Sequence, residues 1–66
     1  MTKEKAIEVM YQGKKVTHIS FKDNEFIKLD TYSNMFETET GQLIHQGIFW
    51  NNHYGKEYHT GWHYVC

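Results

Sequence analysis

The sequence contains little cysteine and no proline or arginine among its 66 residues. Its single cysteine, Cys66, is the last residue, so a disulfide within the chain is excluded. So little cysteine favours a reducing compartment over a secretory one. A domain of this length buries only about 60% of the surface that its unfolded chain exposes. Such small domains usually rely on disulfides, a metal or self-association, which here leaves self-association or a metal.

Long apolar runs are absent as well. No segment approaches the roughly 18–20 apolar residues of a membrane span. The opening Met-Thr-Lys-Glu-Lys is not followed by the apolar run of a signal peptide. The sequence therefore predicts a protein of the cytoplasm that has no membrane partner.

Basic charge is scarce. The net charge is −1 with the histidines neutral, and all seven basic residues are lysines. Proteins that bind duplex DNA or RNA normally carry a clear excess of basic residues, because binding displaces counterions from the phosphates. The charge therefore argues against a DNA or RNA polymer as partner, whereas a small anionic ligand needs only a few positive groups.

The residue pattern predicts a single α+β domain over residues 1–66, with one N-terminal helix packed on an antiparallel sheet of about five strands. The helix is expected over residues 2–12, with Thr2 as its N-cap and Gly13 as its stop, and its apolar stripe consists of Ala6, Ile7 and Met10. Short β-rich runs separated by turn residues follow. The expected strands are Lys14–Phe21, Glu25–Asp30, Met35–Glu39, Leu43–Trp50 and Glu57–Cys66, with a polar loop at residues 51–55.

Aromatic residues are abundant, at 17% of the chain, which is more than a core of this size holds in full. Some rings are therefore expected at a subunit interface or in a ligand pocket. The densest stretch, residues 49–56, reads Phe-Trp-Asn-Asn-His-Tyr-Gly-Lys. Aromatic faces stack on nucleobases at about 1–3 kcal/mol each, asparagine amides can recognise base edges, and a lysine suits a phosphate. The alternative interpretation is a polar hairpin loop flanked by core aromatics.

Catalytic motifs are incomplete. The stretch His18-Ile19-Ser20-Phe21 matches one half of the paired His-x-Ser/Thr signature of two-histidine phosphoesterases. That chemistry needs two histidines, one as base and one as acid, and the second copy of the motif is missing from the sequence. No glycine-rich phosphate loop and no convincing pair of acids is present. We therefore expect a protein that is not an enzyme and has no catalytic residues.

The five histidines also suggest no strong metal site. His59 and His63, four residues apart, would lie about 13 Å apart on one face of a strand, too far for one metal unless the strand is bulged at Gly61. A site formed by His53, His59 and Cys66 is the alternative. Histidines on the surface or at an interface are the favoured interpretation, so neither a metal nor a cofactor is expected.

Two segments resemble a known family. Residues 1–16 read Met-Thr-x-x-x-Ala-Ile-x-x-Met-x-x-Gly-Lys-Lys-Val, Phe21 and Glu25–Asp30 follow, and Gly61–Val65 resembles a closing element. This pattern is similar to a bacteriophage family of cyclic-nucleotide sponges, which includes the Thoeris anti-defence sponge and smaller relatives acting against CBASS immunity. The similarity covers the first 30 residues and the last five. Phe21 stands where the family has tryptophan, and Gly61 replaces the usual acidic residue.

The resemblance implies a viral anti-defence protein that forms a homotetramer in the host cytoplasm. Its subunit interfaces would bind and sequester an immune second messenger without cleaving it, which blocks activation of a CBASS-type effector. The ligand would be a cyclic dinucleotide such as 3'3'-cGAMP, or a cyclic ADP-ribose isomer. The alternative is a phage inhibitor that contacts a host defence protein directly, of the anti-CRISPR or anti-restriction type. A net charge of −1 does not support a DNA-mimicking version of that alternative.

The candidate ligand-binding residues fall into three groups. The first comprises base-stacking rings, of which Phe21 comes from the family position, and contains Phe21, Trp50 and Tyr54. The second comprises hydrogen-bonding side chains and contains Asn24, Asn51, Asn52 and His53. The third comprises phosphate partners and contains Lys56 or Lys14. A core position suits Phe21 and Trp50 equally well.

Overall fold

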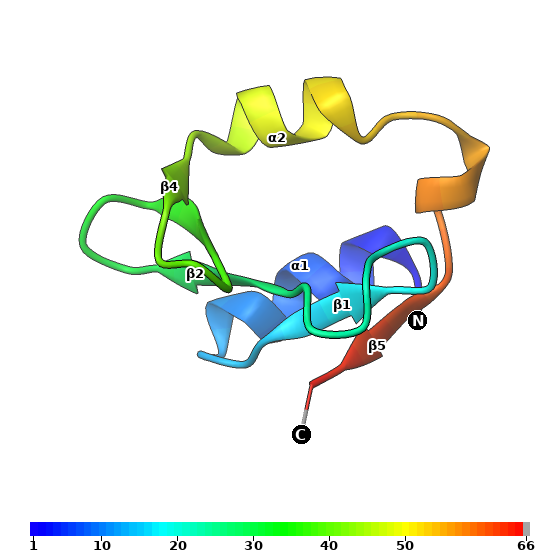
Figure 1. Cartoon of the computed structure of the whole chain (residues 1–66), viewed down its shortest axis with the longest axis horizontal. Helices are drawn as coiled ribbons and strands as arrows, with labels where there is room; N and C mark the ends of the chain where they lie inside the picture. Colours follow the sequence, from blue (N-terminus) through cyan, green and yellow to red (C-terminus); the bar gives the residue numbers. More distant parts are fainter. Residues whose placement is uncertain (66) are drawn as a thin grey trace.

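The structure, a computed structural model, describes residues 1–65. Within this range the chain forms two α-helices, one short 3-10 helix and one five-stranded antiparallel sheet (Figure 1). The elements in chain order are α1 (Lys3–Tyr11), β1 (Val16–His18), β2 (Ile27–Asp30), β3 (Met35–Thr38), β4 (Leu43–Ile44), α2 (Gln46–Asn52), η1 (Lys56–Tyr58) and β5 (Trp62–Tyr64). The predicted class, an N-terminal helix on an antiparallel sheet of about five strands, is confirmed.

The sheet brings the beginning and the end of the chain together. Its strand order is β4-β3-β2-β1-β5, so β1 to β4 follow one another to one edge. Then α2 and η1 return the chain to the other edge (Figure 1). There β5 pairs with β1, with Val16 opposite Tyr64 and His18 opposite Trp62. Met1 extends this edge, because its amino group donates to the Trp62 carbonyl at 2.7 Å and its carbonyl accepts the Trp62 N–H at 3.3 Å.

Helix α1 begins and ends where the sequence predicts. The Thr2 side chain accepts the Lys5 N–H at 3.1 Å, which satisfies one of the free donors of the first turn. Gly13 follows the helix with φ of +88°, a conformation that glycine adopts without strain. The helix buries Ala6, Val9 and Met10. Val9 was missing from the predicted stripe, and Ile7 is only half-buried.

One face of the sheet carries the core. Alternate strand residues point to this face, as period-two geometry requires, and the buried ones are Val16, Ile27, Leu29, Phe36 and Trp62. Helix α1 packs against β1, β2 and β5, and α2 packs against β3. The opposite face is more polar and carries the Lys28–Glu37 ion pair, whose nitrogen and oxygen atoms lie 3.9 Å apart.

The second helix was not predicted. The expected strand Leu43–Trp50 ends at Ile44, and α2 replaces its remainder and the first two residues of the expected polar loop. One cause is local, because the His45 side chain accepts the Gly47 N–H at 3.1 Å and so caps the helix. Phe49 and His53 are four residues apart, and their rings stack with centroids 4.1 Å apart, as neighbouring turns of a helix allow.

The predicted last strand was too long. Residues 57–66 contain the end of η1 and the three-residue β5, with Gly61 between them at φ of +89°. His59 therefore lies outside any strand, and Cys66 lies outside the described residues. The other strands fall inside their predicted ranges. Across residues 1–65, the structure contains no helix with the length and apolar character needed to cross a membrane.

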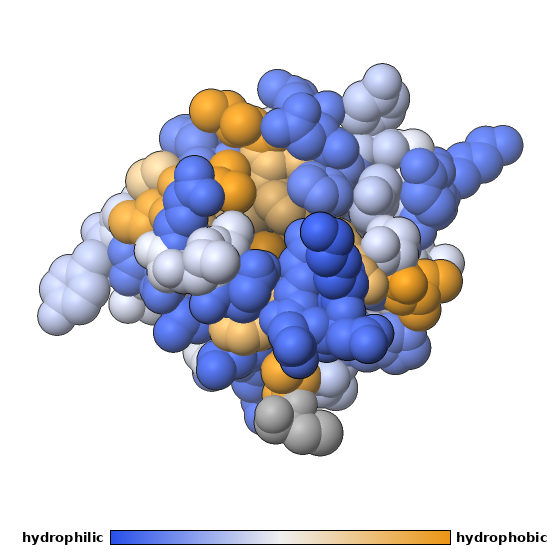
Figure 2. Space-filling model, in the orientation of Figure 1, coloured by the Kyte–Doolittle hydropathy of each residue, from blue (hydrophilic) through white to orange (hydrophobic). Residues whose placement is uncertain are grey.

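Apolar side chains reach the surface in separate places. On the face shown in Figure 2, apolar atoms form several small areas with hydrophilic atoms between them. Every phenylalanine and tryptophan is buried or half-buried. The exposed aromatic side chains are all tyrosines: Tyr11, Tyr32, Tyr54 and Tyr64. These four tyrosines are therefore the first candidates for a ring that stacks on a bound ligand.

Candidate ligand-binding site

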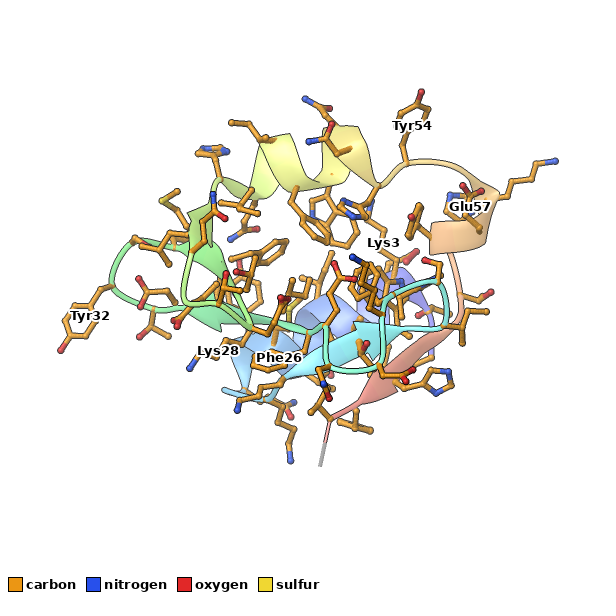
Figure 3. All side chains as sticks on the ribbon, in the orientation of Figure 1. Lys3, Phe26, Lys28, Tyr32, Tyr54 and Glu57 are labelled. Atoms are coloured by element: carbon orange, nitrogen blue, oxygen red, sulfur yellow. The ribbon has the colours of Figure 1, made fainter. Side chains whose placement is uncertain are left out.

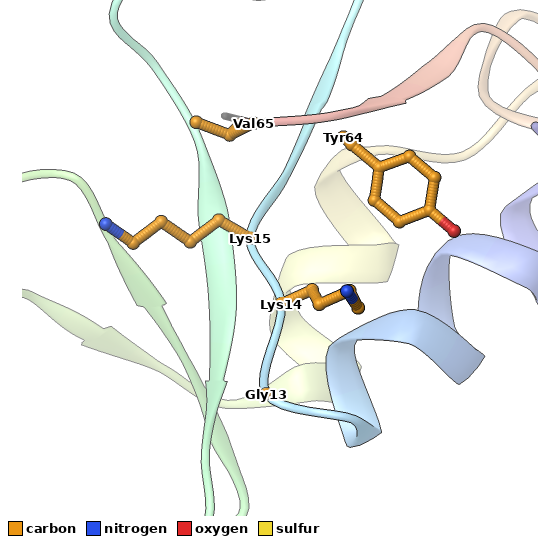
Figure 4. Close-up of a pocket in the computed structure, with 5 residues that line it drawn as sticks. All are labelled: Gly13, Lys14, Lys15, Tyr64 and Val65. Atoms are coloured by element: carbon orange, nitrogen blue, oxygen red, sulfur yellow. The ribbon is translucent and has the colours of Figure 1, made fainter.

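A groove forms where the two ends of the sequence meet. The pairing of β1 with β5 places the segment after α1 beside the end of β5 (Figure 4). The resulting hollow has a volume of about 500 Å³ and is lined by Gly13, Lys14, Lys15, Tyr64 and Val65. We call it the β1–β5 groove. Three of its five lining residues, Gly13, Lys14 and Lys15, adjoin the stop of the first helix.

The two lysines of the groove extend to opposite sides of it. Consecutive residues of an extended segment point to opposite faces, so Lys14 extends toward α1 and the Tyr64 ring, whereas Lys15 extends the other way (Figure 4). The Lys14 Nζ lies 5.9 Å from the Tyr64 ring centroid, and the Lys15 Nζ lies 4.7 Å from the Phe26 ring centroid. Both distances are within the range of cation–π attraction. The groove thus offers two ammonium groups, each close to a ring.

A second hollow adjoins the groove on the open face of the sheet. Its volume is also about 500 Å³, and it shares Lys15, Tyr64 and Val65 with the groove. We call it the outer-face hollow; its other lining residues are Thr17, Asp23, Asn24, Glu25 and Phe26. Two of the nine predicted ligand-binding residues, Lys14 and Asn24, therefore lie at this end of the molecule.

The predicted rings Phe21 and Trp50 pack against the core instead. Both are half-buried, and each ring lies 5.7 Å from the Trp62 ring in an edge-to-face arrangement. The Lys3 ammonium covers the Trp50 ring at 4.2 Å from its centroid. Both rings are therefore engaged in contacts within the chain. This arrangement fits the alternative of a core position for Phe21 and Trp50 better than a base-stacking role.

The remaining predicted residues belong to α2 and the segment after it. His53 stacks on Phe49, and its Nδ1 lies 2.9 Å from the Phe49 carbonyl oxygen, so that nitrogen is the donor. The other four, Asn51, Asn52, Tyr54 and Lys56, are exposed, and Tyr54 points outward (Figure 3). None of the predicted residues from this part of the chain lines the β1–β5 groove.

Lys15, Tyr64 and Val65 were not predicted as ligand-binding residues. All three lie inside the pattern that carries the family resemblance, Lys15 within residues 1–16 and the other two within Gly61–Val65. The pattern contains these residues, but nothing local showed that the beginning and the end of the chain pair across the sheet. The groove depends on this long-range pairing, which local sequence patterns do not reveal.

A polar cluster is centred on the buried His18, which is 3% exposed. Its Nε2 lies 2.7 Å from the Glu57 carbonyl oxygen and 2.8 Å from that of Thr60. Because carbonyl oxygens only accept, Nε2 carries the hydrogen. Its Nδ1 accepts the Ser20 N–H at 3.1 Å and lies 2.8 Å from the Ser20 hydroxyl. These partners assign the neutral Nε2–H tautomer.

This geometry argues against His18 as a base for Ser20. A general base must take up a proton on Nδ1, but the Ser20 N–H already points at that nitrogen. A protonated ring would set two N–H groups against each other. The contacts of Nε2 instead tie β1 to the Glu57–Thr60 segment, which positions β5 beside β1. We therefore assign His18 a structural part in holding the groove together.

The histidines and carboxylates of the described chain do not converge on a metal site. Among residues 1–65, no group of three or more histidine, cysteine, aspartate or glutamate side chains is arranged to hold a metal ion. Of the alternative set His53, His59 and Cys66, His53 donates to a backbone carbonyl of its own helix, and Cys66 lies outside the described residues.

No protein-family model, curated protein or solved structure matches this chain. The function is therefore inferred from the fold, from the groove and from the sequence pattern whose residues line the groove.

Proposed function

We propose that the protein is a phage immune-evasion protein that sequesters a cyclic nucleotide second messenger, such as 3'3'-cGAMP, in the host cytoplasm and does not cleave it. One observation carries the proposal. Two parts of the pattern that resembles the sponge family, residues 1–16 and Gly61–Val65, are far apart in the sequence, and residues from both line one groove.

The composition of the groove matches a nucleotide. A cyclic dinucleotide carries two anionic phosphates and two planar bases. Lys14 and Lys15 supply two ammonium groups, and hydrogen bonds to a charged partner are stronger than those between neutral groups. Tyr64, 54% exposed, supplies a ring face for a base. In this proposal Lys14 and Lys15 bind phosphates and Tyr64 stacks on a base.

Sequestration without cleavage fits the side chains at this position. In the part of the chain that the structure describes, the groove is lined by glycine, lysine, tyrosine and valine, none of which is a carboxylic acid or a histidine. The Nδ1 of His18, the histidine of the incomplete phosphoesterase motif, is committed to Ser20. Such a protein would lower the free concentration of the messenger and so keep the host effector inactive.

Calorimetric titration with 3'3'-cGAMP and a panel of cyclic di- and oligonucleotides tests the proposal. We expect tight binding to at least one member, and intact nucleotide after heat denaturation of the complex. Tyr64→Ala should weaken that binding by about 5- to 150-fold, since one stacked base is worth about 1–3 kcal/mol. Tyr32→Ala is the matched control, because Tyr32 is fully exposed at the turn between β2 and β3 and points away from the molecule (Figure 3).

A second pair of variants separates the two candidate regions. Lys14→Ala should weaken binding and reduce its salt dependence, whereas Lys56→Ala, which removes the same charge beside α2, should leave both unchanged. The opposite result would place the ligand at the segment after α2. Absence of binding across the whole panel, or recovery of a cleaved nucleotide, would overturn the proposed function.

A further inference from the structure

The charge of the surface reverses along the path from the groove to the outer-face hollow. The groove contains two lysines, and its lining within residues 1–65 includes no carboxylate. The outer-face hollow adds Asp23 and Glu25 with Asn24 between them in sequence. Because the two hollows share Lys15, Tyr64 and Val65, one ligand can extend from the first into the second. Its anionic part belongs beside the lysines, since the carboxylates repel it.

The uncharged end of the ligand therefore lies in the outer-face hollow, where the carboxylates are hydrogen-bond acceptors. A carboxylate offers two oxygen acceptors and no donor. Glu25 is partly committed, because its Oε1 accepts the Lys22 N–H at 3.0 Å, whereas the Asp23 side chain is exposed in the turn. Asp23 is thus the carboxylate in the best position to face a base.

Only one common base presents two donors side by side. Guanine carries a ring N–H next to its exocyclic amino group, which matches the two oxygens of a carboxylate. Adenine presents one amino group flanked by ring nitrogens that accept, and these would face a carboxylate oxygen unfavourably. Stacking on a ring does not distinguish the bases, since every base has an aromatic face. The lysines do not distinguish them either, because they contact the phosphates. The carboxylate supplies that distinction.

We propose that the outer-face hollow is the base-recognition part of the site, and that Asp23 selects cyclic nucleotides containing guanine over those containing only adenine. This inference rests on the proposed function. It assigns the phosphates to Lys14 and Lys15 and the Watson–Crick edge of one guanine to Asp23. A hydrogen bond to a charged group is worth about 1.5–3 kcal/mol; at an exposed carboxylate the lower end applies, which corresponds to about a tenfold preference.

Titration with two symmetric ligands tests the selection. The wild-type protein should bind cyclic di-GMP about tenfold more tightly than cyclic di-AMP. Asp23→Asn should bring the ratio of the two dissociation constants close to one, because an amide presents one donor and one acceptor. Glu39→Gln is the matched control: it makes the same change of charge in the neighbouring hollow that residues 22–25 share with Glu39, and it should keep the wild-type ratio.

The outcomes separate the inference from the proposed function. If wild-type protein binds both ligands equally, or prefers cyclic di-AMP, base selection by Asp23 is overturned while sequestration of a cyclic nucleotide stands. A preference for cyclic di-GMP that survives Asp23→Asn overturns the role of Asp23. If neither ligand binds, and no other member of the panel does, the proposed function fails and the inference fails with it.

Discussion

Replacing His18 by leucine tests whether this buried imidazole holds the end of the chain in place. Leucine has a similar volume, so the substitution removes the hydrogen bonds without leaving a large cavity. The Glu57 and Thr60 carbonyls lose their shared donor, and the Ser20 N–H loses its acceptor. A buried polar group left without a partner costs about 1–3 kcal/mol.

These contacts are partly buried rather than fully buried, so water replaces some of what is lost. We therefore expect His18→Leu to lower the free energy of unfolding by about 2–4 kcal/mol. A chain of this length has a total stability of about 3–10 kcal/mol at the usual value per residue. The substitution would thus remove a large part of the stability, and binding to the groove would weaken because β5 is no longer held beside β1.

Urea unfolding followed by tryptophan fluorescence measures the change, because Trp62 is fully buried and its ring lies 4.8 Å from the His18 ring. His63→Leu is the control, since His63 is exposed on β5 and should change stability by less than about 0.5 kcal/mol. Ser20→Ala, which removes one hydroxyl, should cost about 1 kcal/mol and remains measurable if His18→Leu does not fold. A folded His18→Leu protein within about 1 kcal/mol of wild type would refute the reasoning.

Two further predictions concern the turns. The Ser33 hydroxyl donates to the Asp30 carboxylate at 2.7 Å and holds the pKa of Asp30 below its ordinary value. The stabilisation is therefore present above about pH 4 and is lost as the pH falls through the lowered pKa. NMR titration should show the Asp30 pKa rising in Ser33→Ala, and an unchanged value would contradict this cause. Gly61→Ala should destabilise by about 1–3 kcal/mol, and more than Gly13→Ala in thermal unfolding. Both glycines have positive φ, but only at Gly61 would a Cβ approach other side chains, the closest atom lying at 3.0 Å; equal effects would disprove that contact.

Local chemistry in the sequence predicted the first helix and most of the sheet. The Thr2 cap and the Gly13 stop act over a few residues, so their signals are readable without tertiary structure. Helix α2 was missed because its apolar side chains follow one another at Ile48, Phe49 and Trp50, a run that suits a buried strand as well as a helix. The decisive features were the His45 cap and the packing of Phe49 in the core.

The candidate site was harder to predict, because local composition and long-range pairing pointed to different places. Residues 49–56 combine rings, amides and a lysine, but folding turns Trp50 and His53 inward. Tyr64 and Lys14 stand fifty residues apart in the printed numbering and become neighbours only when β5 pairs with β1. Residue types led to the prediction of a nucleotide ligand, whereas the topology determines which of the rings and lysines lie together.

Energetics also connect the groove to the expected homotetramer. A sponge with nanomolar affinity needs about −12 kcal/mol of binding free energy. One stacked base contributes about 1–3 kcal/mol, and two charge-assisted contacts from Lys14 and Lys15 contribute about 1.5–3 kcal/mol each. The sum, about 4–9 kcal/mol, is an upper value, because immobilising the ligand and the lysine side chains opposes it. One groove on one subunit therefore falls short of tight sequestration. A second copy that covers the exposed Tyr64 side chain would supply a second ring and exclude water from the phosphates, so tight binding and self-association should appear or disappear together.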